Sequence, residues 1–188
     1  MLNETFCYAT ELLKSSLCPA ADLAASARLG TCKATPMTRP QGIIKTRRDV
    51  MSDIERTAKA FFEACETGKG WEACKQFCKP DATFSCQADA LANVKTLQAY
   101  TDWMKGLFGP IPDGAYALKA WGVDEKRNAV IAAAVFTGTQ TGNGGPVPPT
   151  GKRVEADYTY VMELDGGKIR HMTKIWNADW SLRQLGWA

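Results

Sequence analysis

Hydrophobic and polar positions along the chain change their period near residue 110, and the change predicts two kinds of structure. Before that point, apolar residues recur at helical spacing. Ser52 is a helix-capping residue type, and Glu55 follows three positions later as its capping-box partner. The predicted helices are 52–67, 71–78 and 93–108, with a further short helix over 179–185.

After residue 110, apolar and polar residues alternate, which is typical of strands. The run 129–139 is apolar on both faces and predicts a central strand that is covered on both sides. Two later runs flank Asp165-Gly166-Gly167, a strong hairpin signal with either Asp165-Gly166 or Gly166-Gly167 at the turn. The predicted strands are 81–86, 115–123, 129–139, 154–164 and 168–177.

Helices followed by long strands predict an α+β fold, with the helices packed over the concave face of a curved antiparallel sheet. The folded domain is expected at 51–188. Residues 1–50 have no sustained period and are predicted to be a disordered or targeting extension. No apolar run is long enough to span a membrane. We expect a cytoplasmic protein, with organellar import through residues 1–50 as the alternative.

The predicted hairpin specifies which residues share a face. Either turn places even-numbered residues of 154–164 beside odd-numbered residues of 168–177. The opposite face sets acids against Lys168, Arg170 and Lys174 and is expected to be exposed. The first face is expected to be the inner one and collects Val154, Ala156, Tyr158, Tyr160, Met162, Leu164, Ile169, His171, Thr173, Ile175 and Asn177.

His171 is the only histidine of the chain and the candidate general acid or base, because imidazole titrates near neutral pH. Asp179 is a second candidate catalytic residue, with a helix cap as the alternative role. Plain core packing is the alternative role of Tyr100, Trp103, Met104 and Trp121. The candidate substrate-binding residues are Tyr158, Tyr160, Thr173, Asn177, Tyr100, Trp103, Met104 and Trp121.

Charge and cysteine content exclude several classes of protein. The net charge is +3, and residues 51–188 carry equal numbers of acidic and basic side chains, which argues against nucleic-acid binding. The seven cysteines follow no secretory signal, so we expect reduced, buried thiols rather than disulfides. Their spacing does not fit a zinc site, and no metal is expected. No convincing phosphate-binding glycine loop is present.

The order of elements resembles the nuclear transport factor 2-like superfamily. Within it, several carboxyl-terminal motifs are similar to the SnoaL-like polyketide cyclase branch, and the likeness covers residues 52–187. These motifs are Pro148-Pro149-Thr150-Gly151-Lys152, Asp165-Gly166-Gly167-Lys168-Ile169, Trp176-Asn177 and Arg183-Gln184-Leu185-Gly186, after Lys79-Pro80-Asp81-Ala82-Thr83-Phe84.

The resemblance implies a cone-shaped pocket for a small, largely apolar ligand and cofactor-free proton transfer of the cyclase, isomerase or hydratase type. Asn177 stands where the branch often has an aspartate, which favours the alternative of a non-catalytic binding or dimerisation module. The resemblance also implies a homodimer through the outer sheet face. Val161, Met172 and Trp176 are the apolar residues expected there.

Overall fold

The computed structural model describes residues 51–188, so the predicted extension at 1–50 lies outside the described residues. Within 51–188, no helix is long and apolar enough to cross a membrane. The elements are α1 (Asp53–Glu66), α2 (Trp71–Cys74), the 3-10 turn η1 (Lys75–Phe77), β1 (Cys78–Cys86), the 3-10 turn η2 (Asp89–Leu91), α3 (Leu97–Leu107), β2 (Ala115–Asp124), β3 (Ala129–Thr139), β4 (Arg153–Asp165), β5 (Lys168–Trp176) and α4 (Ala178–Leu185).

Side-chain caps begin the three longer helices. Ser52 Oγ accepts a hydrogen bond from the Glu55 N–H at 3.3 Å, which confirms the predicted start of α1. Thr96 caps α3 in the same way. The cap of α4 is Asn177, whose Oδ1 accepts from the Trp180 N–H at 3.1 Å, and not Asp179. Gly186 ends α4 in the left-handed conformation that glycine favours, with φ +74°.

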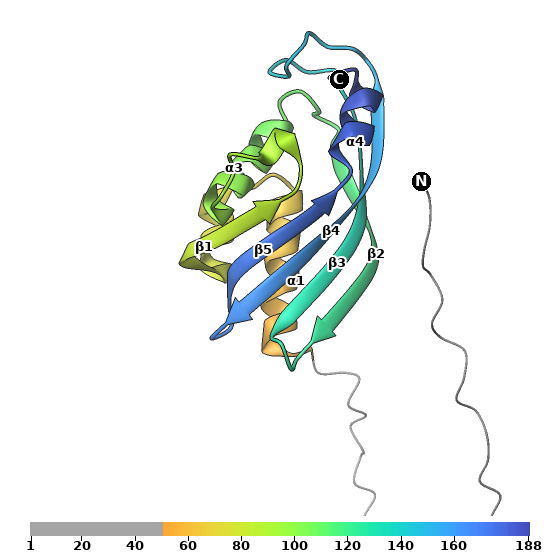
Figure 1. The fold of residues 1–188 in the computed structure, drawn as a ribbon. Helices are drawn as coiled ribbons and strands as arrows, with labels where there is room; N and C mark the ends of the chain where they lie inside the picture. Colours follow the sequence, from red (N-terminus) through yellow and green to blue (C-terminus); the bar gives the residue numbers. More distant parts are fainter. Residues whose placement is uncertain (1–50) are drawn as a thin grey trace, which may run out of the picture. The chain divides into compact units, whose positions relative to one another are not determined.

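Five strands form one sheet in the order β1-β5-β4-β3-β2. The strands β2 to β5 are antiparallel as predicted, but β1 pairs with β5 in parallel, so the sheet is mixed. Figure 1 shows α1 crossing behind the curved sheet and α4 at the end where β5 finishes. The α+β fold class is confirmed.

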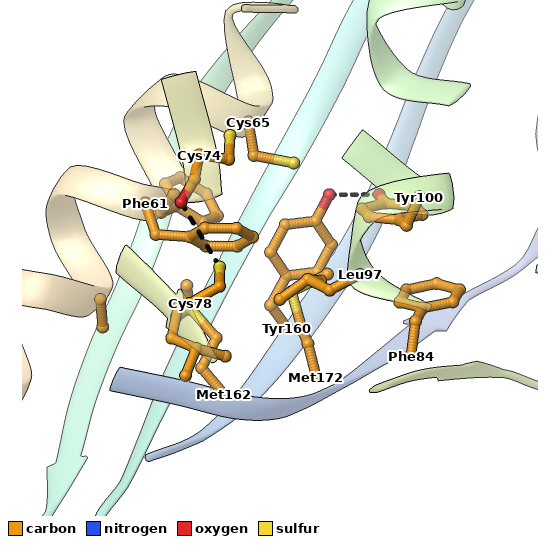
Figure 2. Packing of buried hydrophobic residues seen from close by; sticks show 14 of the residues in the cluster. Phe61, Cys65, Cys74, Cys78, Phe84, Leu97, Tyr100, Tyr160, Met162 and Met172 are labelled. Atoms are coloured by element: carbon orange, nitrogen blue, oxygen red, sulfur yellow. Dashed lines mark hydrogen bonds between the residues drawn. The ribbon is translucent and has the colours of Figure 1, made fainter. Parts of the chain in front are cut away.

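The core lies between the helices and the inner face of the sheet. The ring centroids of Phe62 of α1 and Tyr160 of β4 lie 5.5 Å apart, edge to face. Phe84 stacks on Tyr100 of α3 with ring centroids 4.2 Å apart (Figure 2). The prediction that β3 is covered on both sides is wrong, because burial alternates along the strand and Ile131 on the outer face is 45% exposed.

The β4–β5 hairpin contains a bulge that the sequence pattern did not reveal. Its turn is Gly166-Gly167, with φ of +57° and +74°, as a tight two-residue hairpin requires. Leu164 pairs with Ile169, but the preceding Glu163 pairs with His171, so Arg170 is one extra residue. A bulge of one residue reverses which face each later side chain occupies.

The predicted register is therefore wrong from His171 onward. Met172 is fully buried and Lys174 is only 7% exposed, whereas Ile175, predicted to face inward, is 61% exposed. The change of register also affects the three apolar residues that were predicted for the homodimer interface. Only Val161 lies on the outer face, because Met172 and Trp176 face inward. Dimerisation itself stays a prediction.

Candidate functional site

A cavity lies where α3 and α4 meet the inner face of the sheet. The volume open to water molecules is about 50 Å³. Because one water needs roughly 10–15 Å³ on this measure, the cavity has room for a few waters or a small organic group. Its wall is mostly apolar and aromatic, from residues such as Met104, Trp176 and Trp187, and its charged members are Glu66 and Lys174. A cavity of this kind, with few polar groups, is typical of small-molecule sites.

Lys174 enters the cavity wall from β5 because the bulge turns it inward. Its Nζ donates a hydrogen bond to Tyr100 Oη at 3.0 Å. No carboxylate of residues 51–188 lies within 4.0 Å of this nitrogen. Aromatic rings take the place of a direct counter-ion, since a ring face attracts a cation. The ring centroids lie 4.8–5.8 Å from Nζ and belong to Trp176, Tyr100, Tyr158, Trp103 and Tyr160.

Glu66 is the last residue of α1 and is 2% exposed. Tyr158 donates its hydroxyl to Glu66 Oε2 at 2.5 Å, and Tyr160 donates to Oε1. Burial raises the pKa of Glu66, while Lys174 and the two phenols partly offset that shift. The carboxyl therefore holds its proton to a higher pH than an exposed glutamate does, which suits a group that gives and takes protons.

Hydrogen bonds connect Lys174 to Glu66 through two phenols. Tyr160 donates to Glu66, so the Tyr160 oxygen accepts from the hydroxyl of Tyr100, and Tyr100 in turn accepts from Lys174. Figure 2 shows the hydroxyls of Tyr100 and Tyr160 meeting between α3 and β4. We call these four residues the Lys174–Glu66 chain. Each hydroxyl both accepts and donates, so protons can move along the chain without leaving a polar atom unpaired.

Burial lowers the pKa of Lys174, and the Glu66 charge partly offsets that shift. The shifts of the two groups both favour neutral forms, an amine and a carboxylic acid. Burial also raises the pKa of Tyr100, Tyr158 and Tyr160, so these phenols keep their protons. The site thus offers an acid, a base and hydroxyl donors in an environment that largely excludes water.

The predicted catalytic residues lie elsewhere in the structure. His171 is on the outer face, where Nδ1 contacts Thr83 Oγ1 at 2.7 Å and Nε2 contacts Ser85 Oγ at 3.2 Å. Asp179 is exposed in the first turn of α4. Neither residue lines the cavity. His171 belongs to β5 and Asp179 to α4, and a catalytic role of either residue stays a prediction.

The predicted substrate-binding residues divide into three groups. Tyr158, Trp103 and Met104 line the cavity, and Tyr100 and Tyr160 belong to the Lys174–Glu66 chain behind it. Three others lie away from the cavity lining. Thr173 bonds Ser85 on the outer face, Asn177 caps α4, and Trp121 packs against Phe62 at 6.0 Å.

Sequence reasoning missed Glu66 and Lys174. Glu66 continues the four-residue spacing of Ala58 and Phe62 along the buried stripe of α1, and this spacing is a signal that could have marked a buried acid. Lys174 had no comparable signal, because its face depends on the bulge at Arg170.

The cysteines in the described part of the chain are free thiols, three buried and one half-buried. Burial raises the pKa of Cys74 and of Cys78 to about 12, which leaves both as neutral, unreactive thiols. Within residues 51–188, no group of three or more histidine, cysteine or acidic side chains is arranged to hold a metal ion.

The family model of the SnoaL-like domain matches residues 58–172. The chain belongs to the SnoaL-like family. This family is part of the nuclear transport factor 2-like superfamily, so the resemblance noted in the sequence is confirmed. No curated protein matches the chain.

Solved structures support the same fold. A protein described as a SnoaL-like polyketide cyclase from Jannaschia sp. CCS1 has a TM-score of 0.60 at 18% identity, covering 74% of this chain and 95% of its own. AclR from Streptomyces galilaeus, described as a hydroxylase, has a TM-score of 0.59 at 20% identity over 73% and 83%. An LEH-like epoxide hydrolase from M. tuberculosis has a TM-score of 0.50 at 13% identity over 71% and 89%. At these identities the likeness establishes the fold alone.

Proposed function

We propose that this SnoaL-like protein binds a small, largely apolar carbonyl compound in the cavity and catalyses proton transfer on it without a cofactor. The observation that carries the proposal is the Lys174–Glu66 chain, which ends in a carboxyl and an amine at the cavity wall. The solved relatives described as a polyketide cyclase and an epoxide hydrolase support an enzymatic use of the fold.

In this proposal, the Glu66 carboxylate takes a proton from the carbon next to the carbonyl group. Charge then develops on the carbonyl oxygen, where the N–H donors of Lys174 that are not bonded to Tyr100 act as the stabilising groups. The raised pKa of Glu66 matches this role, because a base works best when its pKa is close to the working pH. The aromatic and apolar wall excludes water, which strengthens each of these interactions.

Hydrogen–deuterium exchange at carbon tests the proposal without knowledge of the natural substrate. Acetone, cyclopentanone and acetophenone are incubated with the full chain in D₂O, and the loss of protons beside the carbonyl is followed by NMR. The wild-type protein should accelerate exchange for at least one of the three. Glu66→Gln should slow that exchange by about 10²–10⁴-fold, the usual contribution of a general base.

The matched control is Tyr116→Phe, which removes a phenol that lies outside the cavity lining and packs against Phe62. This variant should exchange as fast as the wild type. Equal exchange in wild type, Glu66→Gln and buffer would contradict catalysis.

A second candidate function is non-catalytic ligand binding. It is favoured by Asn177, which stands where the branch often has an aspartate and which serves here as a helix cap. Thermal stabilisation by a ketone with no accelerated exchange would select this function.

A further inference from the structure

Lys174 combines features that rarely occur together in a lysine. It is only 7% exposed, yet it is one of the residues that line the cavity. Within residues 51–188, its one hydrogen bond goes to Tyr100, although an ammonium group has three N–H donors. A neutral amine has two N–H donors and a lone pair, so it fits this environment with fewer unmet hydrogen bonds.

The rings around Nζ restrict which reagents reach it. The ring centroids of Trp176 and Tyr158 lie 4.8 and 5.3 Å from the nitrogen, and both residues also line the cavity. A ligand in the cavity therefore meets the amine between aromatic walls. Such walls favour a flat, apolar molecule with one polar end.

We propose that Lys174 is a nucleophile that forms a Schiff base with a small ketone or aldehyde held in this cavity. The inference rests on the proposed function, because both place a carbonyl compound against the Lys174–Glu66 chain. It goes further by naming a covalent intermediate and the atom that forms it. Amines in apolar pockets serve in this way in other proteins, since burial increases the neutral, nucleophilic fraction.

The Schiff base can form with the amine of Lys174 and the carboxyl group of Glu66 as the only reacting protein groups. The lone pair of Nζ forms a bond to the carbonyl carbon, and the carbonyl π electrons move to oxygen. A proton passes from nitrogen to that oxygen, which gives a neutral carbinolamine. Glu66 in its acid form then gives a proton to the hydroxyl, and water leaves with the electrons of the C–O bond. The nitrogen lone pair forms the C=N bond, leaving an iminium cation and the Glu66 carboxylate.

The Lys174–Glu66 chain suits this sequence of charges. In the reactive form, a proton has passed along the chain from the Lys174 ammonium to the Glu66 carboxylate, so the amine and the carboxylic acid are both neutral. After water leaves, the cation and the carboxylate are both charged, so the net charge of the cavity never changes. Tyr158 and Tyr160 already donate to the Glu66 oxygens, and these hydrogen bonds strengthen as the carboxylate forms.

Reductive trapping tests the inference. The full chain is incubated with acetone or cyclopentanone and sodium cyanoborohydride at neutral pH, then analysed by intact mass and peptide mapping. Reduction of the iminium fixes the ligand as a secondary amine and adds the mass of the ketone less one oxygen atom. Label at Lys174 should exceed label at any exposed lysine by about ten-fold or more, because an amine with the ordinary lysine pKa of about 10.4 is almost wholly protonated.

Two variants accompany the wild type. Lys174→Met should abolish the principal adduct, and Lys119→Met should keep it, because Lys119 is an exposed lysine of β2 paired with Asp157 at 2.5 Å. If Lys174→Met does not fold, the peptide map of the wild type still decides. Label spread evenly over surface lysines, or none at all, would overturn the inference.

Different results would overturn the proposal of proton transfer and the proposal of a Schiff base at Lys174. Catalysed exchange in D₂O with no label at Lys174 would leave proton transfer standing and remove the covalent step. Label at Lys174 without catalysed exchange would establish the Schiff base and overturn proton transfer as the protein's reaction. Thermal stabilisation by the ketones with neither label nor exchange would indicate a ligand-binding cavity and overturn both.

Discussion

Replacing Lys174 by methionine should destabilise the protein in a way that depends on pH. Methionine fills a similar volume, so the substitution removes the amine and little packing. It leaves the Glu66 carboxylate buried without the cation to which the two phenols connect it. Removing one of two coupled buried charges costs about 3–5 kcal/mol, and here the coupling runs through the phenols of Tyr100 and Tyr160 and not through direct contact. We expect a loss of about 3 kcal/mol at pH 8, because methionine also removes the cost of burying the amine.

The loss should shrink as the pH falls. Burial raises the pKa of Glu66, and Lys174 holds that pKa down in the wild type, so the variant raises it further. A carboxyl with a raised folded-state pKa stabilises the folded protein below its unfolded pKa and loses that contribution as pH rises through the folded pKa. Near pH 4.5 Glu66 is protonated in the variant. Only the hydrogen bond to Tyr100 is then missing, which costs about 1 kcal/mol.

Urea unfolding of both proteins at pH 4.5 and pH 8 measures this difference. A change of about 2 kcal/mol between the two pH values moves the midpoint by about 1 M when the urea dependence is about 2 kcal/mol/M. The double variant Lys174→Met with Glu66→Gln should regain about 2 kcal/mol at pH 8, since the unpaired charge is gone. A loss that is equal at both pH values and unchanged by Glu66→Gln would refute the charge coupling.

Three further predictions concern the Lys174–Glu66 chain and the β4–β5 hairpin. Tyr160→Phe should cost about 2–3 kcal/mol in urea unfolding, because its hydroxyl bonds both Glu66 and Tyr100, whereas Tyr116→Phe should cost less than about 0.5 kcal/mol. His171→Ala should leave ketone affinity in thermal-shift titrations unchanged, since the imidazole lies on the outer face; a lost affinity would contradict that placement. Deleting Arg170 should preserve fold and ligand binding at a cost of about 1 kcal/mol, as only an exposed ion pair to Glu163 is lost, and circular dichroism with the same titration checks both.

The strands and their hairpin could be predicted because local signals specify them. Gly166-Gly167 supplies the two positive φ angles of the turn, and even-numbered residues of β4 face the core as their alternation indicates. These signals lie within a few residues of each other, and the structure confirms them.

The faces of β5 could not be predicted, because the bulge at Arg170 leaves no mark in the residue pattern. Ile169, His171, Thr173 and Ile175 alternate convincingly as an inward face, although all but Ile169 turn outward. The correct inward set contains Lys174, a residue type that is rarely buried. Its burial depends on Glu66 and the phenols of distant elements, which no local pattern contains.

The central claim is that a carbonyl ligand binds on the inner face of the sheet, between α3 and the Lys174–Glu66 chain. Methyl NMR on protein labelled at methionine and isoleucine tests it most directly, during titration with cyclopentanone. Met104 and Ile111 line the cavity, and Ile131 and Ile175 are exposed on the outer face. We predict that the first pair shifts with ligand concentration and the second pair does not. Shifts confined to Ile131 and Ile175 would contradict the account.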